Sequence, residues 1–250
     1  MDLGIEGRTA LVMGASRGIG LGIAVSLARE GARVAMASRS RERTAEAARE
    51  IEGETVPFEA DTSDLDRLAE LPEEVEAELG PVEILVTNTG GPPLGGAHDH
   101  ESEEWEQAYR SLVLAPKVLT EAVVPGMRER GWGRIVNVGS SSVLEPIPHL
   151  TLSNANRMAA VGLFKTLASE VAADGITVNT VATGRFATDR LASNWGSWEE
   201  MERSAPEGIP AGRLGQPDEF GDLVAFLASE RAAYLTGAVI PLDGGLLRGV

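Results

Sequence analysis

Glycine residues near the N-terminus have the spacing of a turn that can hold a phosphate. Gly14, Gly18 and Gly20 follow the apolar run 9–13, which predicts a buried strand, and from Ile19 apolar residues recur every four positions, as in a helix. A glycine-rich turn from strand to helix presents backbone N–H groups at a helix N-terminus, where they attract a diphosphate. Gly14 would make the sharp exit from the strand, Gly18 would let the diphosphate approach the backbone, and Gly20 would let helix and sheet pack closely.

The spacing of these glycines is G-x-x-x-G-x-G, which by itself is a weak signal. A tight turn between a strand and a helix can use the same glycines and bind nothing. Here the glycines lie between a predicted strand and a predicted helix, which is the context that phosphate binding requires. The turn therefore predicts a dinucleotide site.

The composition excludes several classes of partner. With 250 residues, 43% of them hydrophobic, the chain can bury the core of one α/β domain. A net charge of -16 argues against nucleic acid and anionic membrane surfaces, because contact with their phosphates needs basic patches. The absence of cysteine removes disulfides, thiolate chemistry and cysteine metal sites. Because no signal peptide or long apolar span is evident, we expect a cytoplasmic protein.

Runs typical of strands and helices alternate along the whole chain. Apolar runs predict strands at 9–13, 34–37, 56–58, 84–86, 134–138, 176–181 and 238–242. Helices are expected at 41–52, at 65–79 with a bend or break at Pro72, at 103–130, at 220–227 and along an apolar face of Ala159, Leu163, Leu167 and Val171. Such alternation predicts one domain over 1–250 with a doubly wound (Rossmann) α/β fold, a seven-stranded parallel sheet and helices on both faces.

Polar or small residues that could contact a ligand come directly after predicted strands. They are Arg17, Asp61, Asn88, Ser140 and Gly184. Ligands of doubly wound sheets bind at the carboxyl ends of the strands, near the point where the strand order reverses. This shared placement predicts a single site.

Taken together, these segments resemble the short-chain dehydrogenase/reductase family, in particular its 3-oxoacyl-[acyl-carrier-protein] reductase-like members. The resemblance runs almost from end to end, through the turn 14–20, the loop 87–90, the segment 176–184 and the residues 242–245. Thr183 replaces the proline that is usual in the family. The resemblance implies that Asp61 holds the adenine amine and that the segment around Gly184 lies beneath the nicotinamide.

The resemblance also implies a set of residues that bind the cofactor. These are Gly14, Ser16, Arg17, Gly18, Ile19, Gly20, Ser38, Arg39, Asp61, Thr62, Asn88, Gly90, Gly184 and Thr188.

The end of the second strand favours NADP(H) over NAD(H). An acidic residue at this point would accept hydrogen bonds from the ribose 2′-OH of NAD and repel a 2′-phosphate. Here the strand ends in Ser38 and Arg39, and Arg17 is available in the first turn. Two guanidinium groups suit a phosphate dianion. The alternative is that both arginines are hydrated surface residues.

Three of the four expected catalytic positions depart from the family pattern. Family members reduce a carbonyl with a hydride from the nicotinamide and a proton from a tyrosine, assisted by a serine, a lysine and an asparagine. Ser140 matches the serine. The register of the following helix places Ser153 at the tyrosine position and Arg157 at the lysine position, and Leu112 stands where the asparagine is expected. The two tyrosines of the chain lie elsewhere.

These replacements change the acid–base chemistry. A phenol, with a pKa of about 10, can donate a proton near neutral pH when a cation lies beside it, whereas an aliphatic hydroxyl is a far weaker acid and arginine stays protonated. Ser153 and Arg157 lie four residues apart and share one helix face. With Ser140 they would stabilise an alkoxide as hydride arrives. The proton would come from water or from His149, although an ordinary loop histidine is the preferred interpretation of that residue.

The resemblance implies a substrate lid over about 185–212. Its apolar residues are Phe186, Trp195, Trp198 and Met201. An apolar lid would suit a fatty or aromatic ligand, and the alternative is that the tryptophans only pack the lid down.

Two histidines beside an acid have the chemistry of metal ligands. His98 and His100 flank Asp99. A loop cluster of this kind is more often hydrated surface, so we expect no metal site.

Two functions are left open. The first is an NADP(H)-dependent oxidoreductase acting on a small or acyl carbonyl or alcohol, with Ser140, Ser153 and Arg157 as an altered active site. The second is a nucleotide-binding protein without redox turnover, serving as a regulatory or structural subunit. The expected partner is a small-molecule or acyl substrate, with no nucleic acid and no membrane. The resemblance further implies a homotetramer or homodimer.

Overall fold

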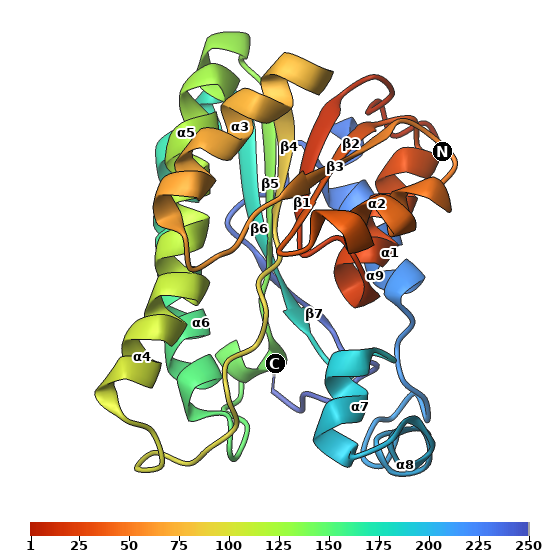
Figure 1. The fold of residues 1–250 in the computed structure, drawn as a ribbon, viewed down its shortest axis with the longest axis vertical. Helices are drawn as coiled ribbons and strands as arrows, with labels where there is room; N and C mark the ends of the chain where they lie inside the picture. The colour runs from red at the N-terminus through yellow and green to blue at the C-terminus, as the bar shows by residue number, and fades with distance from the viewer. Residues whose placement is uncertain (250) are drawn as a thin grey trace.

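A seven-stranded parallel sheet forms the centre of the molecule (Figure 1). The computed structural model describes residues 1–249. The strand order is β3-β2-β1-β4-β5-β6-β7, with every neighbouring pair parallel. The predicted doubly wound fold is therefore confirmed. The strands are β1 Thr9–Met13, β2 Arg33–Ser38, β3 Thr55–Glu59, β4 Val82–Thr87, β5 Gly133–Val138, β6 Ile176–Thr183 and β7 Val239–Leu242.

Helices cover both faces of the sheet (Figure 1). One face carries α1 Gly18–Arg29, α2 Arg41–Arg49 and α9 Pro217–Leu227. The other carries α3 Leu65–Leu79, α5 Ala115–Arg130 and α6 Thr151–Val171. Three shorter helices lie toward the carboxyl ends of the strands: α4 Ser102–Tyr109, α7 Asp189–Trp195 and α8 Trp198–Ser204.

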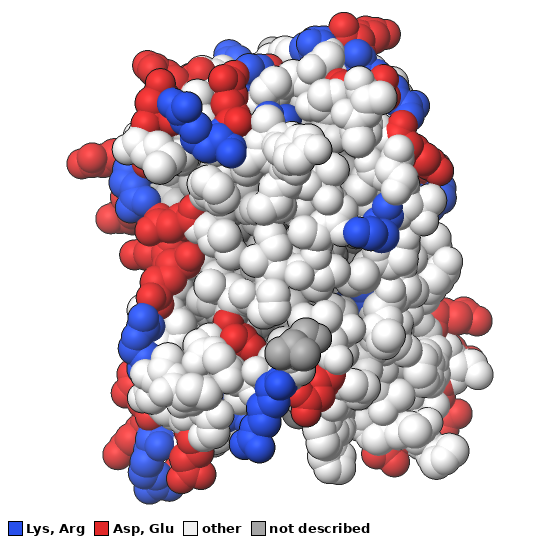
Figure 2. Space-filling model, turned by 180° about the vertical axis from the view of Figure 1, so that it is seen from behind, with Lys and Arg blue, Asp and Glu red and all other residues white. Residues whose placement is uncertain are grey.

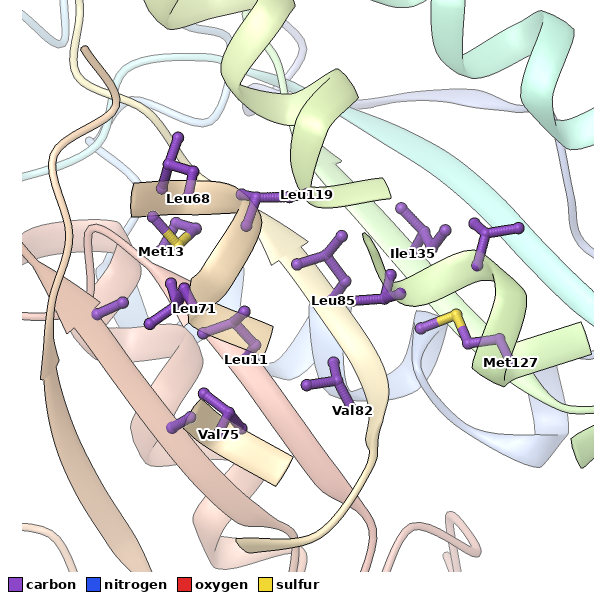
Figure 3. Close-up of a cluster of buried hydrophobic side chains, with 14 of the residues drawn as sticks. Leu11, Met13, Leu68, Leu71, Val75, Val82, Leu85, Leu119, Met127 and Ile135 are labelled. Carbon is purple, nitrogen blue, oxygen red and sulfur yellow. The ribbon is translucent and has the colours of Figure 1, made fainter. Parts of the chain in front are cut away.

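Both faces of the central strands are buried, which explains their continuous apolar sequences. In β1, Leu11 and Met13 point into one apolar layer, and Ala10 and Val12 point into the other. Figure 3 shows the first layer, where strand residues meet leucines of α3 and α5. This packing holds the carboxyl ends of the strands at a common edge.

Proline affects two of the expected helices differently. The helix α3 is continuous through Pro72, so an expected break there is wrong, and the expected bend stays a prediction. Pro72 is buried, and its neighbours Leu68 and Leu71 pack in the core beside the sheet, which holds the helix together where the proline lacks an N–H. The expected helix 103–130 is interrupted by a π-helical turn, Arg110–Leu114. Pro116 cannot donate to the carbonyl four residues earlier, which favours this irregular turn just before it.

The apolar face expected on α6 is offset by one residue. Ala160, Phe164 and Ala168 are buried against the sheet, whereas Ala159 is exposed. Leu163 and Leu167 are half-buried, and only Val171 belongs to both faces. The helix carries small or apolar residues at both sets of positions, so the spacing of four did not distinguish them.

Charged side chains are unevenly spread over the surface. Figure 2 shows acidic and basic residues gathered along the edges of the rear face, with a largely uncharged centre. Within the described residues 1–249, β7 pairs only with β6 and forms one edge of the sheet. Assembly into a homotetramer or homodimer stays a prediction. Among residues 1–249, no helix combines the length and the apolar character needed to cross a membrane.

Candidate functional site

A cleft of about 1580 Å³ runs along the carboxyl ends of the strands. Every residue expected to bind the cofactor or to take part in catalysis lines this cleft, although the segments that carry them are far apart in the sequence. They are Gly14, Ser16, Arg17, Gly18, Ile19, Gly20, Ser38, Arg39, Asp61, Thr62, Asn88, Gly90, Ser140, Ser153, Arg157, Gly184 and Thr188. The roles of the individual residues stay predictions.

The glycine-rich turn has no room for side chains. Gly14 and Gly18 have φ angles of 64° and 55°, which favour glycine. A Cβ on Gly20 would lie 2.1 Å from the carbonyl oxygen of Gly14, and a Cβ on Gly14 would lie 2.8 Å from Nδ2 of Asn88. A Cβ on Gly18 would meet the methyl group of Thr188 at 3.3 Å. The turn is thus a bare backbone cradle at the end of β1.

The N-terminus of α1 is open to a ligand. Its first residue is preceded by Arg17, which makes no side-chain cap, and the first turn contains no acidic residue. In contrast, Ser40 caps α2 and Asp64 caps α3. Backbone N–H groups at such a terminus need partners, and the helix dipole favours an anion. The cradle and the helix together fit the diphosphate of a dinucleotide.

The end of β2 adds a basic residue that the motif analysis missed. Arg43, in the first turn of α2, lines the cleft together with Ser38 and Arg39. Arg43 comes three residues after Ser40, the N-cap of α2. This spacing indicates that Arg43 lies in the first turn of the helix, close to the end of β2. On the other side, Nη1 of Arg17 lies 3.5 Å from Oδ2 of Asp189. The arginines fit a phosphate on the adenosine ribose.

Two of the proposed catalytic residues, Ser153 and Arg157, are hydrogen-bonded to each other, and Ser140 lines the same cleft. Nε of Arg157 donates to Oγ of Ser153 at 3.2 Å, and Nη1 donates to the carbonyl of Val138 at 2.9 Å. Oγ of Ser140 accepts from the backbone N–H of Ser142 at 3.1 Å. Since both serine oxygens accept from the protein, each hydroxyl can direct its hydrogen towards a group in the cleft.

The surroundings of Arg157 disfavour its positive charge. Burial, and then the positive charge of Arg190, lower the pKa of Arg157 to about 10. The guanidinium therefore still carries its charge at neutral pH. A hydrogen bond from a charged donor polarises the Ser153 hydroxyl, which strengthens the hydrogen bond that the hydroxyl donates.

The π-helical turn changes which residue of the long helix faces the cleft. Leu112, expected at the asparagine position, is buried and does not line the cleft. Ser111 and Arg110 do line it. Oγ of Ser111 donates to the carbonyl of Ala108 at 3.3 Å. The only sequence signal for this shift is Pro116.

His149 lies in a loop, as expected, whereas His100 departs from its expected environment. His149 lines the cleft with an exposed side chain and a φ of 60°, an uncommon value for a residue other than glycine. Its carbonyl accepts from the N–H of Gly95 at 2.8 Å, which joins two loops of the cleft. The expectation that His100 is hydrated surface is wrong. Its side chain is 3% exposed and lies beneath Gly95, and its Nδ1 lies 3.4 Å from Oε2 of Glu104.

The segment 185–212 contains α7 and α8 at one side of the cleft (Figure 1). Phe186 packs edge-to-face on Phe220, with 5.3 Å between ring centroids, and Met201 is fully buried. Trp195 lines the cleft, whereas Trp198 is exposed. The apolar residues therefore both pack this segment down and face the cleft. Among residues 1–249, no three His, Asp or Glu side chains are grouped to hold a metal.

Comparison with known proteins identifies relatives over almost the whole chain. Residues 14–247 match the family described as enoyl-(acyl carrier protein) reductase. The chain is 37% identical to acetoacetyl-CoA reductase of Rhizobium meliloti over 240 residues, covering 95% of this chain and 98% of the relative. L-Sorbose reductase of Gluconobacter frateurii, solved with NADPH and L-sorbose, is 32% identical with a TM-score of 0.95, and the match covers 100% of both chains.

A third similar protein is a 3-oxoacyl (acyl-carrier-protein) reductase of Agrobacterium tumefaciens, whose structure holds NADP. It is 32% identical, with a TM-score of 0.91, and the match covers 97% of this chain and 95% of the other. Reductases solved with NADPH or NADP therefore have the same fold as this chain, and the matches cover nearly the full length of both chains.

Proposed function

Since the chain belongs to the short-chain dehydrogenase/reductase family, we propose that it is an NADP(H)-dependent oxidoreductase with an altered active site. It transfers hydride between the nicotinamide and a small or acyl carbonyl or alcohol. The observation that carries this proposal is that the backbone cradle of α1 and the Ser153–Arg157 donor pair line one cleft. The NADPH and NADP held by similar structures support the choice of cofactor.

In this proposal the cofactor half of the cleft is built from backbone and arginine. The N–H groups at the start of α1 bind the diphosphate, and Asp61 accepts from the adenine amine. Arg39 and Arg43 bind the 2′-phosphate, which favours NADP(H) over NAD(H). When bound, the cofactor supplies the hydride.

The substrate half provides hydrogen-bond donors. Ser140 and Ser153 donate to the substrate carbonyl oxygen, and both hydroxyls are oriented because their oxygens already accept from the protein. Negative charge grows on that oxygen as hydride arrives, and the nearby charge of Arg157 stabilises it. Because the cleft is open, water delivers the proton. The segment 185–212 closes over the substrate.

The test is oxidation of NADPH with a broad set of ketones and 3-oxoacyl thioesters. We expect turnover, tighter binding of NADPH than of NADH, and a loss of about 100-fold in kcat/KM for Ser153→Ala. The matched control is Ser169→Ala, on an exposed turn of the same helix, whose kcat/KM should stay within about twofold of the unchanged protein.

Binding of NADPH without turnover of any substrate would overturn the redox proposal. That result would favour the second candidate, a nucleotide-binding subunit without redox activity. Calorimetry that detects neither NADPH nor NADH binding would overturn both candidates.

A further inference from the structure

Two arginines face the substrate half of the cleft from different elements. Arg157 comes from α6 and Arg190 from α7, two helices that lie apart in Figure 1, and both side chains line the cleft. Nη2 of Arg190 donates to the carbonyl of Pro92 at 2.8 Å, so this side chain reaches across to the loop after β4. Arg157 is held by Ser153 and by the end of β5.

Neither guanidinium has a carboxylate partner within residues 1–249. The four acids that line the cleft are occupied or exposed. Asp61 accepts from the N–H and the hydroxyl of Ser63, and Asp189 lies beside Arg17. Glu104 completes the cap of α4, and Glu145 is exposed. Arg190 lowers the pKa of Arg157, and no carboxylate acts on Arg157 in the opposite sense. The two cations are therefore near enough to repel one another.

The cleft is also more basic than the rest of the protein. Seven arginines line it against four acids, although the whole chain has a net charge of -16. The arginines are Arg17, Arg39, Arg43, Arg110, Arg157, Arg185 and Arg190. Arg17, Arg39 and Arg43 lie at the cofactor half, so the phosphates of NADP(H) do not account for the charge at the substrate half.

A partly buried cation with a like charge nearby costs free energy unless an anion compensates it. The planar fork of a guanidinium matches a carboxylate, which can bind two donors at once. Apolar side chains, among them Leu94 and Trp195, line the same cleft. The surroundings thus suit an organic acid better than a free inorganic ion.

On the basis of the proposed oxidoreductase function, we propose that the substrate is a 2-oxo or 3-oxo acid whose carboxylate binds between Arg157 and Arg190. Arg157 donates to Ser153 with its Nε, and its other N–H groups bind the substrate carboxylate. The substrate carbonyl that Ser153 binds is therefore only a few covalent bonds from that carboxylate. Hydride adds to the carbonyl carbon, the C=O π electrons move to oxygen, and water donates a proton. The products are the hydroxy acid and NADP⁺. Arg190 is the residue that determines specificity.

The test compares each acid with its neutral methyl ester. NADPH oxidation is measured with acetoacetate and methyl acetoacetate, and with 2-oxobutyrate and methyl 2-oxobutyrate. We expect kcat/KM to favour at least one acid over its ester by about 30-fold, the size of one charge-assisted hydrogen bond. Arg190→Met should reduce that preference to within about threefold.

The matched control is Arg203→Met on α8, an exposed arginine of the same segment that does not line the cleft. This variant should keep the preference for the acid. The same four ligands are also titrated by calorimetry into protein saturated with NADP⁺. If the acids bind preferentially but nothing turns over, the redox function fails and the anion site stands.

Three results would overturn the inference. The first is equal binding and equal turnover of acid and ester, or no binding of either acid. The second is a preference for the acid that Arg190→Met leaves unchanged. The third is a loss of more than about tenfold in NADPH affinity for Arg190→Met with an unchanged acid preference, which would make the cofactor diphosphate the partner of Arg190.

Discussion

Strand β5 has an arginine pair near each end, and the two pairs are compensated differently. At the amino end, Arg8 and Arg134 both lie over the ring of Trp132, 3.7 and 4.4 Å from its centroid. Arg8 forms an ion pair with Glu83 and lies 3.7 Å from Glu230. At the carboxyl end, Arg157 and Arg190 have no such acids within residues 1–249.

Burial affects the inner arginine of each pair to a similar extent. The pKa of Arg134 and that of Arg157 are both lowered to about 10, first by burial and then by the second arginine. Glu230 offsets part of this effect at Arg134, and nothing offsets it at Arg157. The amino end is therefore complete in the protein alone, whereas the carboxyl end lacks the anion that a substrate would supply.

The largest effect is expected at the compensated end. Arg134→Met removes donors from the carbonyls of Ser229, Gly133 and Gly175, and leaves Glu230 with one fewer cation nearby. We expect the free energy of unfolding to fall by about 3 kcal/mol, measured by urea denaturation. The folded variant should bind NADPH as before. If the free energy of unfolding falls by less than about 1 kcal/mol, the Arg8–Arg134 pair does not contribute more to stability than the Arg157–Arg190 pair.

A smaller change in stability is expected at the uncompensated end. Arg157→Met loses two hydrogen bonds but also removes a charge that has no counter-ion. We expect the free energy of unfolding to change by less than about 1 kcal/mol, while kcat/KM falls by about 100-fold. Denaturation and steady-state kinetics on the same preparation separate the two effects. A stability loss equal to that of Arg134→Met would contradict the comparison.

The smallest effect is expected for an exposed ion pair, in which one arginine binds one carboxylate. Arg213 binds both oxygens of Glu219, at 2.6 and 2.8 Å, and this lowers the pKa of Glu219 from 4.5 to about 2. A lowered carboxyl pKa contributes stability above pH 4.5 that is lost as the pH falls towards 2. Glu219→Gln should cost about 0.5 kcal/mol at pH 7, because solvent screens the pair.

The measurement is denaturation of the unchanged protein and of Glu219→Gln between pH 7 and pH 3. The difference between them should shrink below pH 4.5. A difference that does not vary with pH would contradict the prediction, because both partners that lower the pKa of Glu219, Arg213 and the N–H of Gln216 at 2.8 Å, favour the ionised carboxylate.

The cofactor half could be predicted from sequence because its signals are local. The glycines of the first turn, the apolar strands and the polar residues after them depend on neighbouring positions along the chain. Arg190 could not be found in this way, because its contact with Pro92 joins residues 98 positions apart. Local spacing failed for His100, which a loop covers, and it did not predict the π-helical turn that precedes α5.

The π-helical turn Arg110–Leu114 holds one residue more than an α-helical path of the same length. Each residue of an α-helix advances the side-chain direction by about 100°. Deleting a single residue from this turn would let α4 and α5 join as one regular helix, and both helices would keep nearly their present directions because the turn already accommodates one extra residue. The change would fall on Arg110 and Ser111, which line the cleft, so a one-codon deletion here would reshape its wall without touching the sheet.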